Sequence, residues 1–374
     1  MKRRVVYCCP VPAPYRNAEL DRAAAALGRD SLHTVFDFAQ HPTASWQPTL
    51  PAVCPFHCLN GTPEQHGLHI RELPRLLSEL DPAVVVIGGY SYPVTKVGLR
   101  WCRARGVPYV FRTDTNIWGD RQKGLPRYLL RRLRLRPWLQ HARACLITGS
   151  YNREFWRRYG MRPDQEGWWP QWIDYDHFAH AANLRNEEQP RLKQQFHIRP
   201  EVNLLYVGRL IPRKRVDILC EALCQLDESI GLVVAGHGED EPRLRERYAA
   251  RLGPRLTFAG AVPQTDLVKL YAATDVLVLA SGAGEPWALV LNEAGIGGMP
   301  IICHRHVGAA GDLLIDGQNG AALASDDPAE WATAIRRVTT DRDRLLEMGR
   351  QSTTIVARWR DQSEPADCLR RLIA

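Results

Sequence analysis

Two successive series of strand and helix patterns constrain the fold of this chain more than any other feature of its sequence. Short runs of apolar and β-branched residues alternate with longer amphipathic stretches, which is typical of βαβ units and a parallel sheet. The first series places strands at residues 4–9, 32–38, 83–87, 108–111 and 144–147, with helices at 17–27, 71–80 and 93–105. The second places strands at residues 203–207, 231–235, 256–258, 275–279 and 300–303, with helices at 215–226, 240–252, 264–273 and 287–295. We therefore predict an α/β fold of two Rossmann-like domains that face each other across a cleft.

A polar segment from His180 to Pro190 separates the two series and is typical of a linker. The chain has 374 residues, which is also long for a single hydrophobic core. We therefore assign residues 1–182 to the first domain and residues 190–356 to the second.

The composition is that of a soluble globular protein, and its charge does not select a partner. Lys and Arg number 49 against 41 Asp and Glu, for a net charge of +8. An excess of this size suits anionic small molecules or an anionic membrane surface as readily as nucleic acid, and no nucleic-acid motif is present. No apolar run approaches the roughly 20 residues of a membrane span, and Pro10 interrupts the N-terminal apolar run too early for a signal peptide. We expect a cytoplasmic protein.

The ten cysteines form no disulfide framework. Most lie in apolar runs, where free thiols of a reducing compartment pack as small apolar residues. The candidates for a zinc site are Cys54, His57, Cys58 and His66, but their spacing fits no common zinc motif. We predict no metal site.

The strongest candidate site contains Glu285 and Glu293 and follows the strand at 275–279. Its loop includes Ser281 and Gly284, and a loop with little Cβ bulk lets a ligand approach the backbone. An ionised carboxylate accepts hydrogen bonds from two adjacent hydroxyls, as on a sugar or a ribose. The alternative is that Glu285 only opens the helix, where an acid suits the dipole, and that Glu293 lies on its solvated face.

A second candidate site is the turn GRLIPRK at residues 208–214. Gly208 ends a strand, Arg209 projects from the strand end, and Lys214 lies where the next helix starts. Two cations at a helix N-terminus make an anion site that suits a diphosphate.

Gly236 and Gly238 follow the next strand. A dinucleotide fingerprint would need a third glycine, but that position is Glu241. We expect these glycines to let a backbone loop pass near the ligand.

A basic segment at residues 121–136 contains seven Lys and Arg residues and no acid. Leucines are interleaved with the cations, at positions 129, 130, 133 and 135. Such a helix can lie on anionic lipid headgroups or gather a diphosphate-bearing acceptor. It can equally be an ordinary solvated face, and the sequence leaves both interpretations open.

Together these motifs resemble the retaining glycosyltransferases of family four, which have the glycosyltransferase B fold. The resemblance spans both halves and is strongest in the second. The matching stretches there, in order, are GRLIPRK (208–214), VVAGHGEDEPRL (233–244), FAGAVPQTDLVKLYAATDVLVLAS (258–281) and EPWALVLNEA (285–294). The last stretch matches the family's pair of glutamates separated by seven residues.

The resemblance implies a role for each matching residue. Arg209 and Lys214 would bind the donor diphosphate in place of a metal. Glu285 would contact hydroxyls of the transferred sugar, and Glu293 would hold the ribose hydroxyls. Backbone amides around residues 288–290 would cap the phosphates. The implied donor-binding residues are Gly208, Arg209, Lys214, Gly236, Gly238, Ser281, Gly284, Glu285, Pro286, Trp287, Ala288, Leu289, Val290 and Glu293. The implied catalytic residues are Arg209, Lys214, Glu285 and Asp114.

The first domain departs from the family pattern at two points. Many members have a glycine pair after the first strand, where this chain has Pro12 and Pro14. Many also place a histidine opposite the donor sugar; here the corresponding loop is 112–116, and Asp114 is our candidate for the same contact. The predicted acceptor-binding residues are Tyr15, Arg16, Tyr90, Arg112, Asp114 and Asn116. The residues from about 357 to 374 would return as a helix to this domain, which would bind the acceptor, while the second domain binds the donor.

The implied activity is retaining, metal-independent transfer of a sugar from a nucleoside diphosphate sugar to a glycan, lipid-linked or small-molecule acceptor. No cofactor and no nucleic-acid partner are expected. The protein would act at the cytoplasmic face of a membrane, with an anionic membrane surface as a partner. A non-catalytic relative that binds nucleotide sugars and a nucleotide-sugar epimerase are the alternatives.

Overall fold

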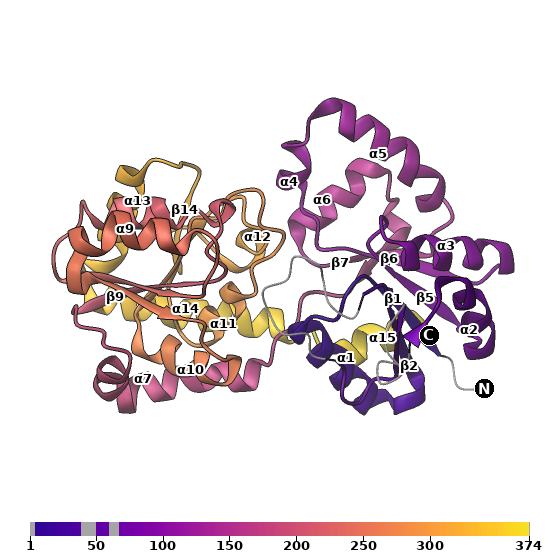
Figure 1. The fold of residues 1–374 in the computed structure, drawn as a ribbon, viewed down its shortest axis with the longest axis horizontal. Helices are drawn as coiled ribbons and strands as arrows, with labels where there is room; N and C mark the ends of the chain where they lie inside the picture. The colour runs from indigo at the N-terminus through magenta and orange to yellow at the C-terminus, as the bar shows by residue number, and fades with distance from the viewer. Residues whose placement is uncertain (1–3, 39–49, 60–66, 374) are drawn as a thin grey trace. The chain divides into compact units, whose positions relative to one another are not determined.

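The two predicted series of strands form two parallel sheets, one in each of two structural units (Figure 1). The computed structural model describes residues 4–38, 50–59 and 67–373. The first unit contains residues 1–173 and 362–374, and the second contains residues 174–361. The chain therefore passes from the first unit to the second and returns once.

The first unit contains a sheet of eight strands in the order β4-β3-β2-β1-β5-β6-β7-β8. Every pairing in it is parallel, from β1 with β2 and β5 outward to the two edges. The strands are β1 Val5–Cys9, β2 Leu32–Phe36, β3 Phe56–Leu59, β4 Gly67–Leu68, β5 Val84–Gly88, β6 Tyr109–Arg112, β7 Ala144–Ile147 and β8 Glu166–Trp168. The helices are α1 Pro14–Leu27, α2 Leu73–Leu80, α3 Pro93–Arg105, α4 Ile117–Arg121, α5 Gly124–Leu139, α6 Ser150–Tyr159 and α15 Pro365–Ile373.

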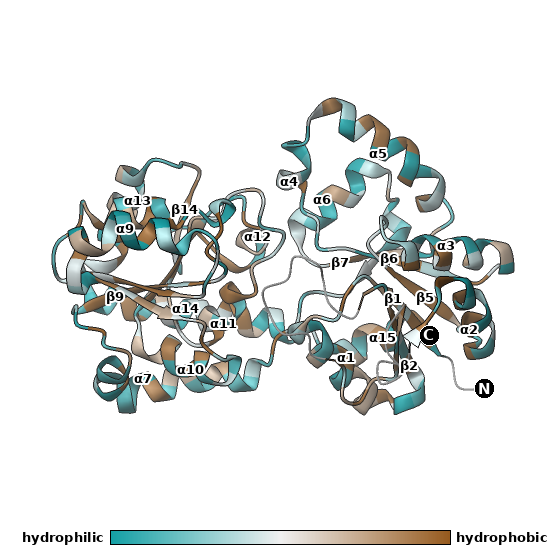
Figure 2. Ribbon diagram, in the orientation of Figure 1, coloured by the Kyte–Doolittle hydropathy of each residue, from teal (hydrophilic) through white to brown (hydrophobic). Residues whose placement is uncertain are grey.

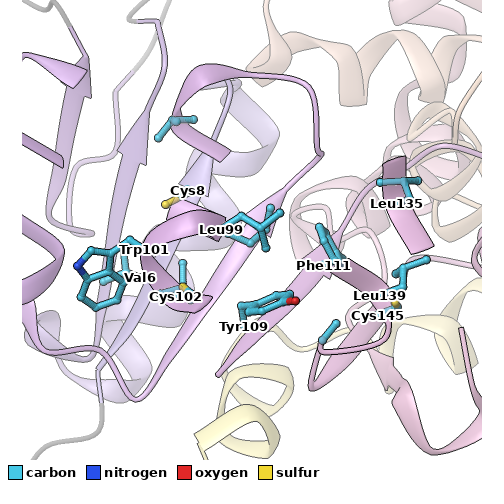
Figure 3. Packing of buried hydrophobic residues seen from close by; sticks show 14 of the residues in the cluster. Val6, Cys8, Leu99, Trp101, Cys102, Tyr109, Phe111, Leu135, Leu139 and Cys145 are labelled. Atoms are coloured by element: carbon cyan, nitrogen blue, oxygen red, sulfur yellow. The ribbon is translucent and has the colours of Figure 1, made fainter. Parts of the chain in front are cut away.

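The central strands of this sheet are buried on both faces, so they read as continuous apolar runs rather than alternating ones. Successive side chains of β1 point to opposite faces, and each face has its own core. Val6 and Cys8 belong to one core cluster with residues of α2, α3, α5 and α6, among them Leu99 and Leu135 (Figure 3). Tyr7 belongs to the opposite core, which α1 and α15 cover.

The second unit contains a sheet of six parallel strands in the order β11-β10-β9-β12-β13-β14. The strands are β9 Val202–Val207, β10 Ile230–Ala235, β11 Leu256–Gly260, β12 Val276–Leu279, β13 Ile301–His304 and β14 Gly320–Leu323. The helices are α7 Tyr175–Gln195, α8 Val216–Leu223, α9 Glu241–Leu252, α10 Gln264–Ala273, α11 Val290–Ile296, α12 Ala310–Leu313, α13 Pro328–Thr339 and α14 Arg342–Arg360. This strand order reverses direction between β9 and β12, as in a doubly wound nucleotide-binding sheet.

The predicted α/β class and both parallel sheets are confirmed. Each strand predicted in either series is a strand of the corresponding sheet. Four strands were not predicted: β3, β4, β8 and β14. They are short or rich in Gly, Ala and His, so they lack the β-branched runs by which strands are recognised.

The predicted linker at residues 180–190 is wrong, because these residues lie inside α7. The helix is polar because few of its side chains are buried, namely Tyr175, Phe178, Ala181 and Leu192. The boundary between the units instead follows Ile173, where Asp174 caps α7 by accepting from the His177 amide.

The return to the first unit begins at Gln362 rather than at about residue 357, since α14 belongs to the second unit up to Arg360. The returning helix is α15, which packs against α1 and contributes Leu369 and Leu372 to the first unit's core. Nowhere in the described ranges is a helix long and apolar enough to cross a bilayer.

Candidate functional site

The candidate residues of the first unit lie at the carboxyl ends of β1, β5 and β6. The strand order places β1 between β2 and β5, so the connections from β1 and β5 leave in opposite directions. Ligands of open α/β sheets bind at such a switch point.

Tyr15, Arg16 and Asp114 come together at this edge of the sheet. The Arg16 guanidinium lies 5.8 Å from the Tyr15 ring centroid and donates to the Tyr7 hydroxyl over 2.5 Å. Burial alone would lower the pKa of Arg16, but Tyr7, Cys9, Tyr15 and Asp114 raise it above its usual value. Two of the loops predicted from the sequence therefore share one electrostatic environment.

Arg112 is buried at the strand end of β6 and has a charged partner within the first unit. Its side chain is buried, and its two terminal nitrogens donate to the Glu19 carboxylate over 2.9 and 2.7 Å. The guanidinium also stacks on Trp169, whose indole donates to Glu19 over 2.6 Å. The Arg112 charge therefore holds α1 against the strand end of β6, and a contact of Arg112 with an acceptor stays a prediction.

Asn116 is also a structural residue. Its side chain is buried and caps α4 by accepting from the Gly119 amide over 2.8 Å. Asn152 of α6 then clamps the loop before this cap, since its amide group donates to the carbonyls of Thr113 and Thr115. The loop therefore holds Asp114 in place through its neighbours.

Glu19 and Asn152 were not recognised from the sequence. For Glu19 a signal was present, since it lies on the face of α1 that also carries Leu20, Ala23 and Ala24, and a charged residue on a buried face needs a partner. Nothing in the sequence separated Asn152 from an ordinary surface asparagine.

Tyr90 follows β5 and connects this edge of the sheet to helix α5. Burial raises the pKa of its hydroxyl, whereas the Arg131 charge and a hydrogen bond with Thr115 lower it. The Arg131 guanidinium lies 5.7 Å from the Tyr90 ring centroid.

In the second unit, the structure brings Lys214 and Glu285 together. The Lys214 ammonium forms a hydrogen-bonded ion pair with Glu285 Oε2, and Arg213 lies 3.5 Å from the same oxygen. Arg213 also donates to the Gly284 carbonyl over 2.5 Å. The turn after β9 and the loop after β12 thus form one charged site, as their positions at adjacent strand ends predict.

Two glycines of the loop after β12 have a structural reason for their size. A Cβ on Gly282 would lie 2.7 Å from the Arg215 guanidinium, and one on Gly284 would lie 3.1 Å from the Arg213 side chain. Ser281 is buried, and its hydroxyl makes no hydrogen bond among the described residues. Arg213 and Arg215 therefore lie against the two glycines of this loop, and the Ser281 hydroxyl is buried within it.

Gly236 and Gly238 admit the protein's own backbone. A Cβ on Gly236 would lie 1.9 Å from the Gly208 carbonyl oxygen, and one on Gly238 would lie 2.2 Å from that of Leu210. The absence of a Cβ at these two positions therefore allows close contact with the backbone of the turn after β9. Their contact with a donor stays a prediction.

The segment EPWALV is not helical up to residue 290, so the predicted helix start at Trp287 is wrong. Ala288 has φ = +80°, which a helix does not allow and which costs a non-glycine residue of order 1–3 kcal/mol. Trp287 fixes the turn, since its indole donates to Asn292 over 2.9 Å and stacks on Trp359. The Gly308 amide donates to the Glu285 carbonyl on the other side. Backbone strain held by its surroundings is a mark of functional loops.

Glu293 is buried, so its alternative placement on a solvated helix face is wrong. Its carboxylate accepts from the Tyr271 hydroxyl over 2.6 Å. Burial raises its pKa to about 7, although the hydrogen bond from Tyr271 lowers it.

No group of three or more potential metal ligands occurs in the part of the chain that the structure describes. Of the zinc candidates considered from the sequence, His66 lies outside the described residues. Cys54 is buried against Thr34, and its thiol donates to the Leu32 carbonyl.

Two doubly wound units, each with its polar residues at the switch point of its sheet, define a protein of the glycosyltransferase B fold class. The whole chain superposes on HepE from Anabaena in complex with UDP-glucose, with a TM-score of 0.75, 16% identity and 99% coverage of both chains. It also superposes on WaaG, a glycosyltransferase involved in lipopolysaccharide biosynthesis, with a TM-score of 0.64, 19% identity and coverage of 99% and 98%. At these identities the likeness shows the fold.

At the level of sequence, residues 188–354 match the family described as "Glycosyl transferases group 1". D-inositol 3-phosphate glycosyltransferase 2 from Catenulispora acidiphila is 31% identical over 225 residues, which are 57% of this chain and 51% of that protein. Glycogen synthase from Mycobacterium tuberculosis is 35% identical over 142 residues, or 37% of this chain and 34% of that protein. The chain thus spans about half, or less, of the length of these curated relatives.

Proposed function

We propose that this protein is a glycosyltransferase that moves a hexosyl group from a nucleoside diphosphate sugar to an acceptor hydroxyl. The observation that carries the proposal is the charged site of Arg213, Lys214 and Glu285 at the strand ends of the second unit. This site lies inside the residues that match the group 1 glycosyl transferases. The UDP-glucose bound by HepE supports the same class of donor.

The growing charge on the leaving diphosphate is the feature that such a site has to stabilise. Arg209 and Lys214 would supply fixed positive charge there, which is usually the largest catalytic effect. Glu285 holds Lys214 in place, and Arg213 lies 3.5 Å from the same carboxylate oxygen, so two cations share one acid and the site keeps a positive charge. We propose a metal-independent reaction on this basis.

The two glutamates would have separate tasks in donor binding. Glu285 would contact hydroxyls of the transferred sugar, and Glu293 would hold the ribose hydroxyls. Retention of configuration would follow if the leaving phosphate accepts the acceptor's proton on the same face of the sugar, which needs no side-chain base. Asp114, held at the strand end of β6, is the candidate of the first unit for a contact with the donor sugar.

The acceptor is proposed to be a glycan or a lipid-linked glycan, bound by the strand ends of the first unit through Tyr15, Arg16 and Tyr90. Arg112 and Asn116 would act only by positioning, because their side chains brace that edge. The protein is proposed to act at the cytoplasmic face of a membrane.

The proposal is tested by assaying transfer from a panel of nucleoside diphosphate sugars, chosen first by the thermal stabilisation that each donor gives. Arg209→Ala is expected to lower turnover by about two orders of magnitude, as for the loss of one charge-stabilising group. Arg245→Ala is the control, since Arg245 is an exposed partner of Glu241 on α9. Unchanged turnover in Arg209→Ala would show that the site is wrong, and an absolute requirement for manganese would contradict the metal-independent mechanism.

A further inference from the structure

Helix α5 of the first unit exposes its apolar side chains instead of burying them. Only Leu135 and Leu139 of its 16 residues are buried. The exposed leucines, with the accessible fraction of each, are Leu125 (63%), Leu129 (49%), Leu130 (49%) and Leu133 (74%). They are half of the large apolar residues that the described part of the chain exposes, so the concentration on one helix needs an explanation.

Three of these leucines form a ridge. Leu125, Leu129 and Leu133 are spaced four residues apart, and side chains at i and i+4 lie on the same face of a helix. Figure 2 shows apolar and polar stretches alternating along α5. A surface helix normally turns such a stripe toward its own core, and here the core takes only a second, narrower stripe.

Arginines flank this ridge, and α5 contains no acidic residue. Arg131 is internally compensated, because it forms an ion pair with Asp120. In contrast, no carboxylate of the described residues forms an ion pair with Arg127, Arg134 or Arg136. The surface therefore combines exposed leucines with uncompensated positive charge, which ordinary solvated helices balance with acids.

A groove of about 710 Å³ lies beside the ridge, between α3 and α5. Its charged walls are formed by Lys96, Arg100, Arg127, Arg131 and Arg134, and no acid lines it. Leu99, Leu130, Leu135 and Trp138 contribute apolar surface. One end is at Tyr90, at the strand end of β5. A cavity with cations and hydrocarbon side by side suits a ligand that has an anionic head and an apolar tail.

We propose that α5 and this groove form a docking surface for an anionic phospholipid bilayer. The leucine ridge enters the boundary between headgroups and acyl chains, while Arg127, Arg134, Arg100 and Lys96 hold a lipid phosphate in the groove. Cations of this kind attract anionic lipids, and the leucines add the burial that charge alone does not supply.

Charge decides against the other occupants of this surface. A second copy of the chain would bring two faces of the same sign together, which disfavours pairing. A single-stranded nucleic acid would be expected to meet exposed aromatic side chains for base stacking, whereas this ridge carries leucines. The docking surface would explain the proposed location at a membrane. It does not depend on the proposed sugar transfer, since vesicle binding and turnover are measured separately.

The test is sedimentation of the full chain with vesicles of phosphatidylcholine that contain about one third phosphatidylglycerol. We expect binding to these vesicles, little binding to pure phosphatidylcholine, and a marked loss of binding in about 1 M salt, where the Debye length falls to about 3 Å. Arg127→Gln with Arg134→Gln is expected to weaken partitioning about 30-fold, since each basic residue near such a surface contributes about fivefold. Leu129→Gln with Leu133→Gln is expected to weaken it by at least tenfold through lost apolar burial.

Matched controls come from the second unit. Arg245→Gln with Arg247→Gln removes the same charge from exposed positions of α9, and Ile315→Gln with Leu346→Gln removes two exposed apolar side chains. Both controls should bind as the unaltered chain does. All exchanged positions are exposed, so folding is retained, and circular dichroism checks this.

Several outcomes would overturn the proposal. Vesicle binding that survives the leucine exchanges would exclude insertion of the ridge. An equal loss in the Arg245→Gln with Arg247→Gln control would show a general charge effect. An equal loss in the Ile315→Gln with Leu346→Gln control would show a general effect of exposed apolar side chains. Thermal stabilisation by inorganic phosphate or glycerol phosphate without vesicle binding would make the groove a site for a soluble anion. Binding of single-stranded RNA, or self-association lost in the leucine variant, without vesicle binding would assign the surface to those partners.

Discussion

Two buried glutamates, one in each unit, have opposite surroundings. Glu19 accepts from both terminal nitrogens of Arg112 and from the Trp169 indole, so its charge is fully compensated. Glu293 accepts from the Tyr271 hydroxyl and forms no ion pair among the described residues. Burial accordingly raises the pKa of Glu293 to about 7.

The difference separates a carboxylate that stabilises the folded protein, Glu19, from one whose charged form destabilises it, Glu293. A buried ion pair with good geometry is costly to break from one side, whereas a buried carboxylate without counter-charge is the pattern of a binding site. The unused hydrogen-bonding capacity of Glu293 fits the proposed contact with ribose hydroxyls. Free energies of unfolding of single variants test this contrast.

Removing the compensated carboxylate should have the largest effect. Glu19→Ala leaves the Arg112 guanidinium buried without a counter-charge, and we expect the unfolding free energy of the first unit to fall by about 3–5 kcal/mol. Urea unfolding followed by tryptophan fluorescence measures this loss.

The matched control is Glu166→Ala. Glu166 pairs with Arg153 and Arg157 at the surface, so the same charge is removed without burial. A loss of at most about 1 kcal/mol is expected there. If Glu19→Ala costs no more than this control, the buried pair does not hold the fold.

Exchange of the uncompensated carboxylate should stabilise the protein at alkaline pH. The folded pKa of Glu293 is about 7 against an ordinary 4.5, so its stability contribution is fully present below pH 4.5 and is lost as the pH rises through 7. Glu293→Gln removes this loss, and we expect the variant to be more stable at pH 8 by up to about 3 kcal/mol, with no difference near pH 4. Urea midpoints across this pH range measure the effect, and a variant that gains nothing at pH 8 would place Glu293 with Glu19 as a compensated group.

Loss of the Tyr271 hydroxyl that donates to Glu293 should have the smallest effect, in the opposite direction. Tyr271→Phe keeps the ring and removes the hydroxyl that lowers the pKa of Glu293. We expect that pKa to rise above 7 and stability at pH 8 to fall by about 2 kcal/mol, which is typical of a hydrogen bond to a charged group. In the Glu293→Gln background the pH dependence of this loss should disappear, and its persistence there would assign it to another group.

Much of the fold followed from periodicity, because buried parallel strands such as β5 and β12 are short apolar runs between amphipathic helices. The linker predicted at residues 180–190 was wrong because composition alone distinguishes a polar helix from a linker poorly. At the site, the proximity of Lys214 and Glu285 could be predicted, since both follow strands that are neighbours in the order typical of this fold.

Contacts made across long sequence separations could not be predicted. Arg112 looked available for a ligand because its partner Glu19 is 93 residues away, and spacing says nothing of such a pair. The left-handed conformation of Ala288 was equally hidden, since alanine favours helices and the close approach of Gly308 to the Trp287 backbone cannot be read from the sequence.

The return of the chain through α15 has a consequence for biosynthesis. Cys368, Leu369 and Leu372 complete a core whose other residues lie between Val5 and Trp169. Residues 174–361 emerge from the ribosome before this helix, and domains generally fold as units during synthesis. The second unit can therefore become native first, while the nascent first unit still exposes the apolar surface beside α1 and needs either time or a chaperone until α15 has emerged.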